Sequence, residues 1–515
     1  MQVIEQTEIE IEVENDVYEI FEKYLESAER TDPIKCVGRV TKVHGLLIES
    51  SGPQAIIGEI CRIITSREGK IIMAEVVGLH DETVQLMLYD EPSGIEIGDK
   101  VTALGSRLEV PVSDNLLGRV LDALGNPIDG KGSIASTSMY PALANPPDPL
   151  KRKLITERIT TGVRAIDGLI AVGKGQRLGI FAGSGVGKST LLGMIARNTS
   201  ADVNVVALIG ERGREVNDFI ENVLGEEGLK RSVVVATPSN SPPLARLRGA
   251  YVATAIAEYF RDQGKDVMLF FDSVTRFARA MREIGLASGE PAAQKGYPPS
   301  MFDSMPKLLE RSGTSDKGSI TGFYSVLVDG DDLDEPVTDT VRGILDGHII
   351  LSRQLQHANH YPPIDVLHSI SRLARYVSGP LSRNASGVIR KYMADYSSKE
   401  DLINVGAYRQ GTNPSIDAAI AMHDPIEKFL VQEVYEQSTL EDTLTFMSEL
   451  TGIEIPQEEM TDEGTKFSQP SEDVHREKAQ QPQKNDLITE DSTAALNSVA
   501  SLFSTLPGMN ILDDN

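Results

Sequence analysis

A glycine-rich turn between an apolar segment and a helix-forming segment constrains this chain more than any other feature. The segment reads QRLGIFAGSGVGKST over residues 176–190. Glycines have no Cβ, so the backbone can wrap closely around a phosphate group, and the N–H groups that open the following helix attract anions. Lys188 can reach the β and γ phosphates of a nucleotide, and the Ser189 hydroxyl suits Mg²⁺. The pattern predicts a phosphate-binding loop made of Gly183, Ser184, Gly185, Val186, Gly187, Lys188, Ser189 and Thr190.

The loop departs from the strict motif at its first position, where the chain has Ala182 in place of glycine. Alanine is small enough to be accommodated there. The alternative interpretation is a glycine-rich turn that binds nothing. The apolar strand before the turn and the helix after it favour phosphate binding.

Length and composition limit the classes of protein to which the chain can belong. With 515 residues, 40% of them hydrophobic, the chain can bury several cores, so we expect two or three domains. Two cysteines are too few for a disulfide framework, which favours the cytoplasm. No run approaches the roughly 18 apolar residues of a membrane span, so we expect only peripheral membrane association. A net charge of −26 without a basic stripe argues against nucleic-acid binding and favours protein cargo.

The residue pattern changes along the chain and predicts five segments. Short β-type runs separated by turns indicate an antiparallel barrel, because closure removes exposed strand edges. Apolar strands that alternate with helical stretches indicate an α/β domain, a parallel sheet covered by helices on both faces. The segments are an acidic arm that binds a partner or is merely frayed (1–32), the barrel (33–102), the α/β domain (103–377), a helical domain (378–455) and an acidic disordered tail (456–515).

Six apolar runs are the expected strands of the α/β domain: RLGIF, VNVVALIG, SVVVATPS, DVMLFFDS, SITGFYSVLV and GHIIL. Their near-continuous apolar character indicates burial on both faces of the sheet. In the helical segment, apolar residues at helical spacing predict a core made of Ile389, Tyr392, Met393, Leu402, Ile403, Ile416, Ala419 and Ile420.

Two carboxylates follow expected strands, at the edge of the sheet where nucleotides bind in such folds. Asp272 ends the run DVMLFFD and can hold Mg²⁺ through water, although capping of the next helix is the alternative role. Glu211 follows VNVVALIG and can polarise a water in line with the γ phosphate. Charged turns are usually solvated loops, so the spacing alone leaves both interpretations of Glu211 open.

Several strings together make the chain resemble a known family. TGVRAIDGL, AGSGVGKST, GERGREVNDFIE, FFDSVTRFARA and HYPPIDVLHSISR occur in the order found in the hexameric ATPases that include the rotary ATP synthase catalytic subunit and the ATPases of type III protein export. The resemblance covers about residues 35–450. It implies an α/β fold with a RecA-like parallel sheet core, an N-terminal β-barrel and a C-terminal helical domain. It also implies a Mg²⁺-dependent ATPase that works as a homohexamer.

The resemblance also implies roles for individual residues of these strings. Glu211 orients or activates the attacking water, with Arg212 beside it, and Asp272 serves magnesium. Arg372 matches the arginine finger that enters the neighbouring subunit's site. An aromatic residue that lies against adenine corresponds to Tyr361, and Phe429 is expected to complete that pocket.

The choice of branch within this family rests on three segments. Residues 282–313 resemble the protein-export ATPases, and with PDPLKRK over residues 147–153 and the GSGVGKST form of the loop they favour the flagellar branch over the injectisome branch. Gln294 and Lys295 replace the Thr-Arg pair expected there, and the C-terminal tail exceeds the usual length. A non-catalytic ring subunit is a further alternative, against which Glu211 argues.

The family resemblance and the residue spacing also lead to expectations about partners and metal sites. The resemblance implies stator or regulator, stalk and membrane gate proteins as partners, with secreted cargo and its chaperones, at the inner face of the cytoplasmic membrane. His357 and His360 lie three residues apart but have no nearby third ligand, so we expect surface histidines and no zinc site.

Overall fold

The computed structural model describes residue 21, residues 36–328 and residues 335–461. These residues all fall within one unit of the chain. The expected N-terminal arm, apart from Phe21, and the expected tail beyond residue 461 lie outside the described residues.

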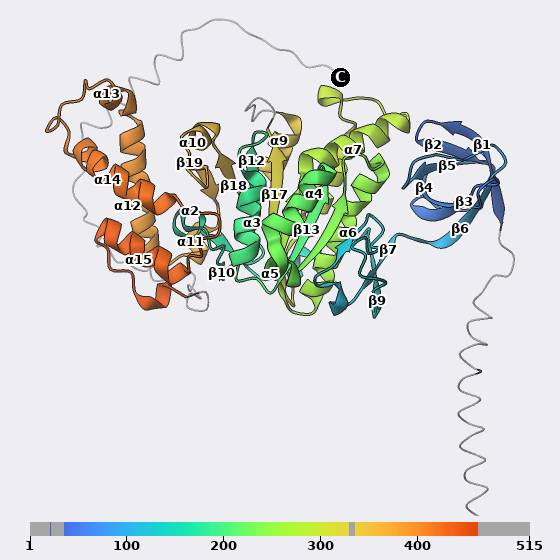
Figure 1. The fold of residues 1–515 in the computed structure, drawn as a ribbon, viewed down its shortest axis with the longest axis horizontal. Helices are drawn as coiled ribbons and strands as arrows, with labels where there is room; N and C mark the ends of the chain where they lie inside the picture. The colour runs from blue at the N-terminus through green and yellow to red at the C-terminus, as the bar shows by residue number, and fades with distance from the viewer. Residues whose placement is uncertain (1–20, 22–35, 329–334, 462–515) are drawn as a thin grey trace, which may run out of the picture. The chain divides into compact units, whose positions relative to one another are not determined.

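Six strands near the N-terminus form a closed barrel, as the turn-rich β pattern predicts (Figure 1). Neighbours pair in the order β1-β2-β5-β4-β3-β6, and the barrel interior is apolar, with Val40, Ile48, Ile63, Ile72 and Leu86 buried. The last strand continues past residue 102, where the sequence places the boundary. The strands are β1 (Val37–His44), β2 (Leu47–Ser50), β3 (Glu59–Ile64), β4 (Ile71–His80), β5 (Thr83–Leu88) and β6 (Lys100–Arg107).

The central sheet has the order β19-β18-β12-β17-β15-β13-β14-β8, with β16 (Gly313–Thr314) beside β17. The six expected apolar runs all form strands, and they pair in parallel. One edge differs from the expected parallel sheet, because β19 runs antiparallel to β18. The strands are β8 (Val120–Leu121), β12 (Arg177–Ala182), β13 (Val203–Ile209), β14 (Ser232–Thr237), β15 (Asp266–Asp272), β17 (Ser319–Leu327), β18 (Gly347–Leu351) and β19 (Ile364–Ser371).

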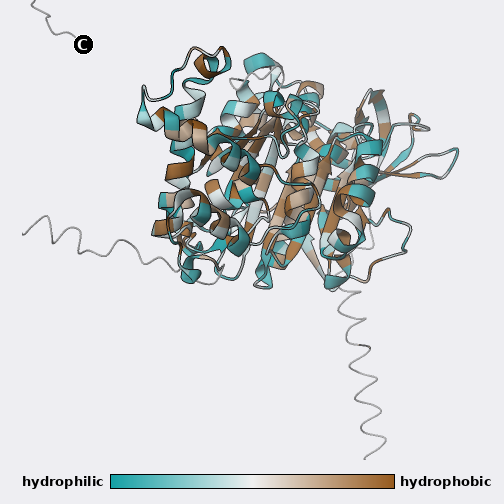
Figure 2. Cartoon of the chain, turned by 60° about the vertical axis from the view of Figure 1, so that its left-hand side comes forward, coloured by the Kyte–Doolittle hydropathy of each residue, from teal (hydrophilic) through white to brown (hydrophobic). Residues whose placement is uncertain are grey.

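Helices cover both faces of this sheet, and Figure 2 shows hydrophobic residues concentrated along its strands. Alternate residues of β13 belong to two separate cores: Val205 packs with α6 (Pro243–Asp262) and α7 (Val274–Ala287), whereas Val206 packs with α3 (Lys188–Asn198). The remaining helices of this domain are α2 (Arg164–Leu169), α4 (Gly213–Asp218), α5 (Gly225–Lys230), α8 (Pro299–Leu309), α9 (Pro336–Ile344), α10 (Arg353–His357) and α11 (Ala374–Val377). Two small sheets pair β7 (Glu109–Val112) with β9 (Ser138–Pro141) and β10 (Arg158–Ile159) with β11 (Val172–Gly173).

The C-terminal part is helical, as expected. Seven of its eight expected core residues are buried or partly buried, but Leu402 is 45% exposed, because it lies on the five-residue helix α13 at the surface. The domain also extends further than the sequence suggests: Glu459, assigned to the tail, is buried and accepts a hydrogen bond of 2.8 Å from the Ser382 N–H, in the first turn of α12. The helices are α12 (Pro380–Ser397), α13 (Glu400–Asn404), α14 (Pro414–Leu430) and α15 (Leu440–Thr451). Among the described residues, no helix combines the length and apolar character needed to cross a membrane.

A buried ion pair joins the barrel to the central domain. Glu75 on β4 accepts a hydrogen bond of 2.8 Å from Nε of Arg248 on α6 and another of 2.7 Å from the Tyr89 hydroxyl. The Glu75 side chain is 2% exposed, so the carboxylate depends on these donors.

Candidate active site

The phosphate-binding loop connects the end of β12 to the start of α3. Gly185 has a φ of 79° and Gly187 a φ of 97°, left-handed conformations that favour glycine. In the described part of the chain, no backbone N–H from residue 183 to residue 189 donates to another protein group. A run of N–H groups without a protein acceptor, ahead of a helix N-terminus, fits the oxygens of a nucleotide phosphate.

Lys188 is the first residue of α3 and brings two carboxylates together. Its ammonium group contacts Oδ1 of Asp272, and it lies 3.8 Å from Oε1 of Glu211. The three side chains are between 3% and 11% exposed, so they face one another in a largely water-excluded place. The sequence predicts each of these residues, and the fold brings them to one edge of the sheet, at the carboxyl ends of β12, β13 and β15 (Figure 1).

A hydroxyl group orients the Asp272 carboxylate. Ser325 on β17 donates a hydrogen bond of 2.7 Å to Oδ1 of Asp272. Oxygen ligands such as this carboxylate and the Ser189 hydroxyl are those that Mg²⁺ prefers, with the remaining positions filled by phosphate and water. No local pattern indicates Ser325, because it lies 53 residues from Asp272 and only the parallel pairing of the strands places it nearby.

Glu211 is in an environment that favours its neutral form. Burial raises the pKa of its carboxyl group to about 7, the neighbouring Asp272 carboxylate adds to the rise, and the cations Lys188 and Arg276 oppose it. Arg276 Nη2 lies 3.9 Å from Oε2, whereas Oε1 is buried and has no hydrogen-bond partner. A carboxyl with a pKa near neutrality and an oxygen that accepts no hydrogen bond is suited to accept a proton from water. Arg276 is a contributor that pattern reasoning missed, although it lies in the string FFDSVTRFARA.

Arg212 follows Glu211 but points elsewhere in this structure. Its side chain is 77% exposed, and its guanidinium lies 3.5 Å from the carboxylate of Glu215 one turn along α4. The structure therefore does not bring Arg212 into the cluster around Lys188.

The two aromatic residues expected at the base have different positions. A Cβ placed on Gly187 would lie 3.7 Å from the ring of Tyr361, so Tyr361 is beside the phosphate loop. Phe429 is fully buried, and its ring packs edge-to-face on Phe446 with centroids 5.4 Å apart. The expectation for Phe429 is therefore wrong, because a ring enclosed in the core of the helical domain has no free face for adenine.

Arg372 lies at the other end of the sheet from the phosphate loop. Its N–H donates to the carbonyl of Asp346 at 3.0 Å, and the Asp346 carboxylate bonds Arg177, the first residue of β12. The loop begins after the last residue of β12, and a six-residue strand spans about 20 Å. Arg372 is exposed. It cannot reach Lys188 of its own chain.

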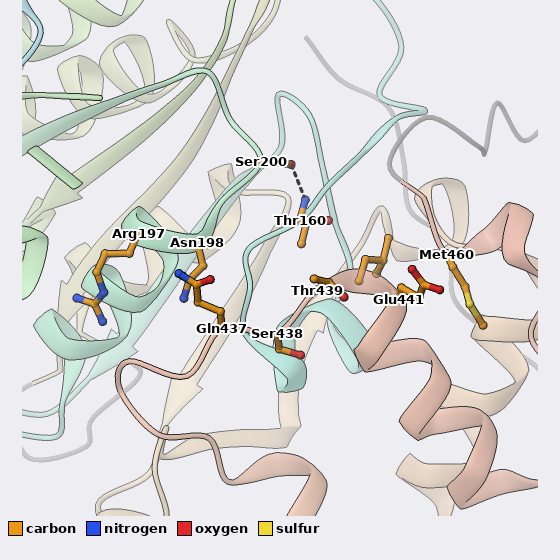
Figure 3. A pocket seen from close by; sticks show the side chains of 10 residues that line it. Thr160, Arg197, Asn198, Ser200, Gln437, Ser438, Thr439, Glu441 and Met460 are labelled. Atoms are coloured by element: carbon orange, nitrogen blue, oxygen red, sulfur yellow. Dashed lines mark hydrogen bonds between the residues drawn. The ribbon is translucent and has the colours of Figure 1, made fainter. Parts of the chain in front are cut away.

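A cavity of about 270 Å³ lies beside the loop and is lined by Gly183, Ser352, Gln354, Asp365 and His368 among others. A second cavity, of about 440 Å³, lies at the C-terminal end of α3 and is lined by Thr160, Arg197, Asn198, Ser200 and Thr439 among others (Figure 3). None of the expected nucleotide or catalytic residues lines this larger cavity.

The two histidines differ in exposure. His357 is exposed as expected, but His360 is buried, with Nδ1 3.2 Å from the Pro362 carbonyl and Nε2 3.4 Å from the Glu427 carboxylate. Within the described ranges, no group of three or more His, Cys, Asp or Glu side chains could hold a metal ion.

Family models match three parts of the described chain. Residues 162–371 match the nucleotide-binding domain of the ATP synthase alpha/beta family, residues 40–105 match the beta-barrel domain of the same family, and residues 380–449 match the T3SS EscN ATPase C-terminal domain.

Similar curated proteins cover most of the chain. The flagellum-specific ATP synthase of Treponema pallidum is 58% identical over 84% of this chain and 97% of its own length. The protein of the same name from Bacillus subtilis is 52% identical over 84% of this chain and 98% of its own length. The type 3 secretion system ATPase of Xanthomonas euvesicatoria is 49% identical over 80% of this chain and 94% of its own.

A solved structure agrees with the fold. The assembled ATPase EscN of the enteropathogenic E. coli type III secretion system is 44% identical, with a TM-score of 0.76 over 80% of this chain and 99% of that one. A second structure contains EscN in complex with its central stalk EscO, with a TM-score of 0.75 and 44% identity over the same shares of the two chains.

Proposed function

The chain belongs to the ATP synthase alpha/beta family, in the group of flagellar and type III secretion ATPases, and on this basis we propose that it hydrolyses ATP to support protein export during flagellum assembly. One observation carries the chemical part of the proposal. Lys188, Asp272 and Glu211 meet beside a glycine-rich loop whose N–H groups have no protein acceptor among the described residues. The flagellar assignment rests on the identity of 58% to the Treponema pallidum protein, which exceeds the 49% to the Xanthomonas euvesicatoria protein.

ATP binding replaces the carboxylate that contacts the Lys188 ammonium group with phosphate oxygens. The ammonium group of Lys188 contacts the Asp272 carboxylate. The β and γ phosphates compete with Asp272 for this ammonium group, and they bind it more strongly because they carry more charge. They also accept hydrogen bonds from the N–H groups of residues 183–189. The exchange frees Asp272 for a divalent cation.

The residues present fit a magnesium ion bound with the nucleotide. Ser189 and Asp272 would hold it, and Ser325 keeps the Asp272 carboxylate oriented through its bond of 2.7 Å. A bound Mg²⁺ supplies positive charge that offsets the charge of the phosphates.

Glu211 acts on the attacking water in this proposal. Its free oxygen Oε1 accepts a hydrogen bond from the water and so aligns it with the γ phosphate. The pKa of this carboxyl is about 7, so near neutral pH it can both accept a proton and release it again. A silent ring subunit would not need such a group, which favours the catalytic over the non-catalytic alternative.

Arg372 completes the site of a neighbouring copy. Its place at the far end of β12, together with its exposure, excludes action on its own loop and makes it available to another chain. We propose a homohexameric ring, in which each site takes its loop from one subunit and a guanidinium from the next. The assembled state of EscN and its complex with the stalk EscO support a ring with a stalk partner.

The remaining parts of the proposal concern partners and location. The family resemblance leads us to propose stator or regulator proteins, membrane gate proteins, cargo and chaperones as partners. It also leads us to propose a location at the inner face of the cytoplasmic membrane. The injectisome is the second candidate system. Presence of the gene among flagellar genes supports our choice, and presence among injectisome genes contradicts it.

Phosphate release by the purified protein tests the enzymatic part. We expect ATP-dependent, Mg²⁺-dependent turnover that a Lys188→Ala variant loses by at least about a hundredfold, because the ammonium acts on the transferred phosphoryl group. A Lys188→Ala variant that retains normal turnover contradicts the assignment.

A further inference from the structure

A side chain from another element fixes one peptide of the phosphate loop. Nε2 of Gln356 donates a hydrogen bond of 2.9 Å to the carbonyl oxygen of Gly185. The two residues are 171 positions apart, and Gln356 lies on the short helix α10 between β18 and β19. The bond therefore connects the segment between two edge strands of the sheet to the middle of the phosphate loop.

The helix that carries Gln356 is itself anchored. The Ser352 N–H, at the start of α10, donates to the Pro363 carbonyl at 2.8 Å, which closes the segment between the two strands. The His360 N–H donates to the Leu355 carbonyl at 2.9 Å within the segment. The same segment carries Tyr361, whose ring lies beside Gly187. Gln356 thus contacts the loop from a segment whose own backbone hydrogen bonds hold it in place.

The direction of the Gly185 carbonyl decides the direction of a neighbouring N–H group. A trans peptide is planar, so the carbonyl of Gly185 and the N–H of Val186 point in opposite directions. Gly185 has a φ of 79° and no atom within 4 Å of where a Cβ would lie, so no packing contact fixes the Gly185 side of this peptide, whereas the Val186 side chain on the other side is buried. The bond from Gln356 adds a direct restraint on the carbonyl itself.

We propose that Gln356 is a positioning residue for the phosphate loop, which keeps the Gly185–Val186 peptide turned so that the Val186 N–H faces the bound phosphates. This inference rests on the proposed function, since it concerns how the same loop receives ATP. The bond acts equally on bound substrate and on the transition state, so its loss weakens nucleotide binding and leaves the chemical step largely intact.

The test compares two glutamines, one at the loop and one remote from it. Gln356→Met removes the donor and keeps the length of the side chain, and Gln356→Glu replaces the donor with a carboxylate that repels both the carbonyl and the phosphates. Gln410→Met and Gln410→Glu are the matched controls, because Gln410 is an exposed glutamine of the helical domain, between α13 and α14. The measurements are the Kd of ADP by calorimetry, KM and kcat for ATP, and the unfolding temperature.

We expect Gln356→Met to raise the Kd of ADP and the KM of ATP about fivefold, as the loss of one hydrogen bond does, with kcat within about twofold of the parent. Gln356→Glu should have the larger effect, and both Gln410 variants and all unfolding temperatures should stay close to the parent. ADP binding by Gln356→Met equal to that of the parent overturns the proposal, as does an equal loss in Gln410→Met. If the parent has no ATPase activity, the proposed function fails, while the ADP measurements still decide the role of Gln356.

Discussion

The pKa of Glu211 makes a prediction about the pH dependence of turnover. The carboxyl must be ionised to accept a proton from water, and its pKa is about 7 because it is buried beside Asp272. The profile of kcat/KM against pH reports the ionisation of the free enzyme. We therefore expect kcat/KM to rise with pH, to be half-maximal near pH 7, and to fall about tenfold for each unit of pH below that.

A neighbouring cation gives this prediction a sharper form. Arg276 lies 3.9 Å from Glu211 and lowers the pKa of that carboxyl, so its removal must raise the pKa further. The acid limb of an Arg276→Gln variant should therefore move to higher pH, by about half a unit to one unit for a partly screened charge. Arg276→Lys keeps the charge and is the matched control, with a limb close to that of the parent.

The assay is phosphate release at limiting ATP between about pH 5.5 and 9, at constant ionic strength and with Mg²⁺ in excess. Comparison of the parent with the Arg276 variants cancels the titration of ATP itself, which is common to all of them. A parent profile that is flat down to pH 5.5 would refute the assignment of Glu211. So would a limb that stays in place in Arg276→Gln.

Two further predictions concern contacts that the fold creates over long separations. Replacing Ser325 with alanine removes the bond of 2.7 Å to Asp272 and should raise the Mg²⁺ concentration needed for half-maximal phosphate release by about tenfold; an unchanged Mg²⁺ titration argues against this role. Replacing Arg248 with alanine leaves the Glu75 carboxylate buried without its cation and should cost about 3–5 kcal/mol of unfolding free energy in urea, whereas a Glu75→Met, Arg248→Met double variant should lose much less. A loss below about 1 kcal/mol in the single variant contradicts the view that this pair holds the barrel to the central domain.

Local sequence patterns are sufficient for the buried parts of the fold. The six apolar runs are strands because residues buried on both faces leave near-continuous hydrophobic segments, which no loop would show. The edge strand β19 is not such a run, because the polar residues Asp365, His368 and Ser369 interrupt its apolar residues. Leu402 fits a helical period but lies on a short surface helix, and periodicity does not report which helix is covered by another.

The residues of the site also differ in whether local sequence patterns predict them. Lys188, Asp272 and Glu211 follow strands of one parallel sheet, so the topology rule that places them together can be applied before any coordinates are known. Ser325, Arg276 and Gln356 touch this cluster or its loop through contacts that depend on packing, and such contacts leave no local signature. Phe429 shows the opposite failure: the family resemblance implies a contact with adenine, but the helical domain uses this ring in its own core.

The central claim is that each ATP-cleaving site is built from two copies of the chain. Lys188→Ala subunits retain Arg372, and Arg372→Ala subunits retain Lys188, so in mixed rings some interfaces combine an intact loop with an intact guanidinium. Phosphate release by an equal mixture should recover to about a quarter of the parent rate, the share of interfaces that random head-to-tail assembly restores. A mixture no more active than either variant alone, or full activity from the parent chain held as separate monomers, would contradict the account.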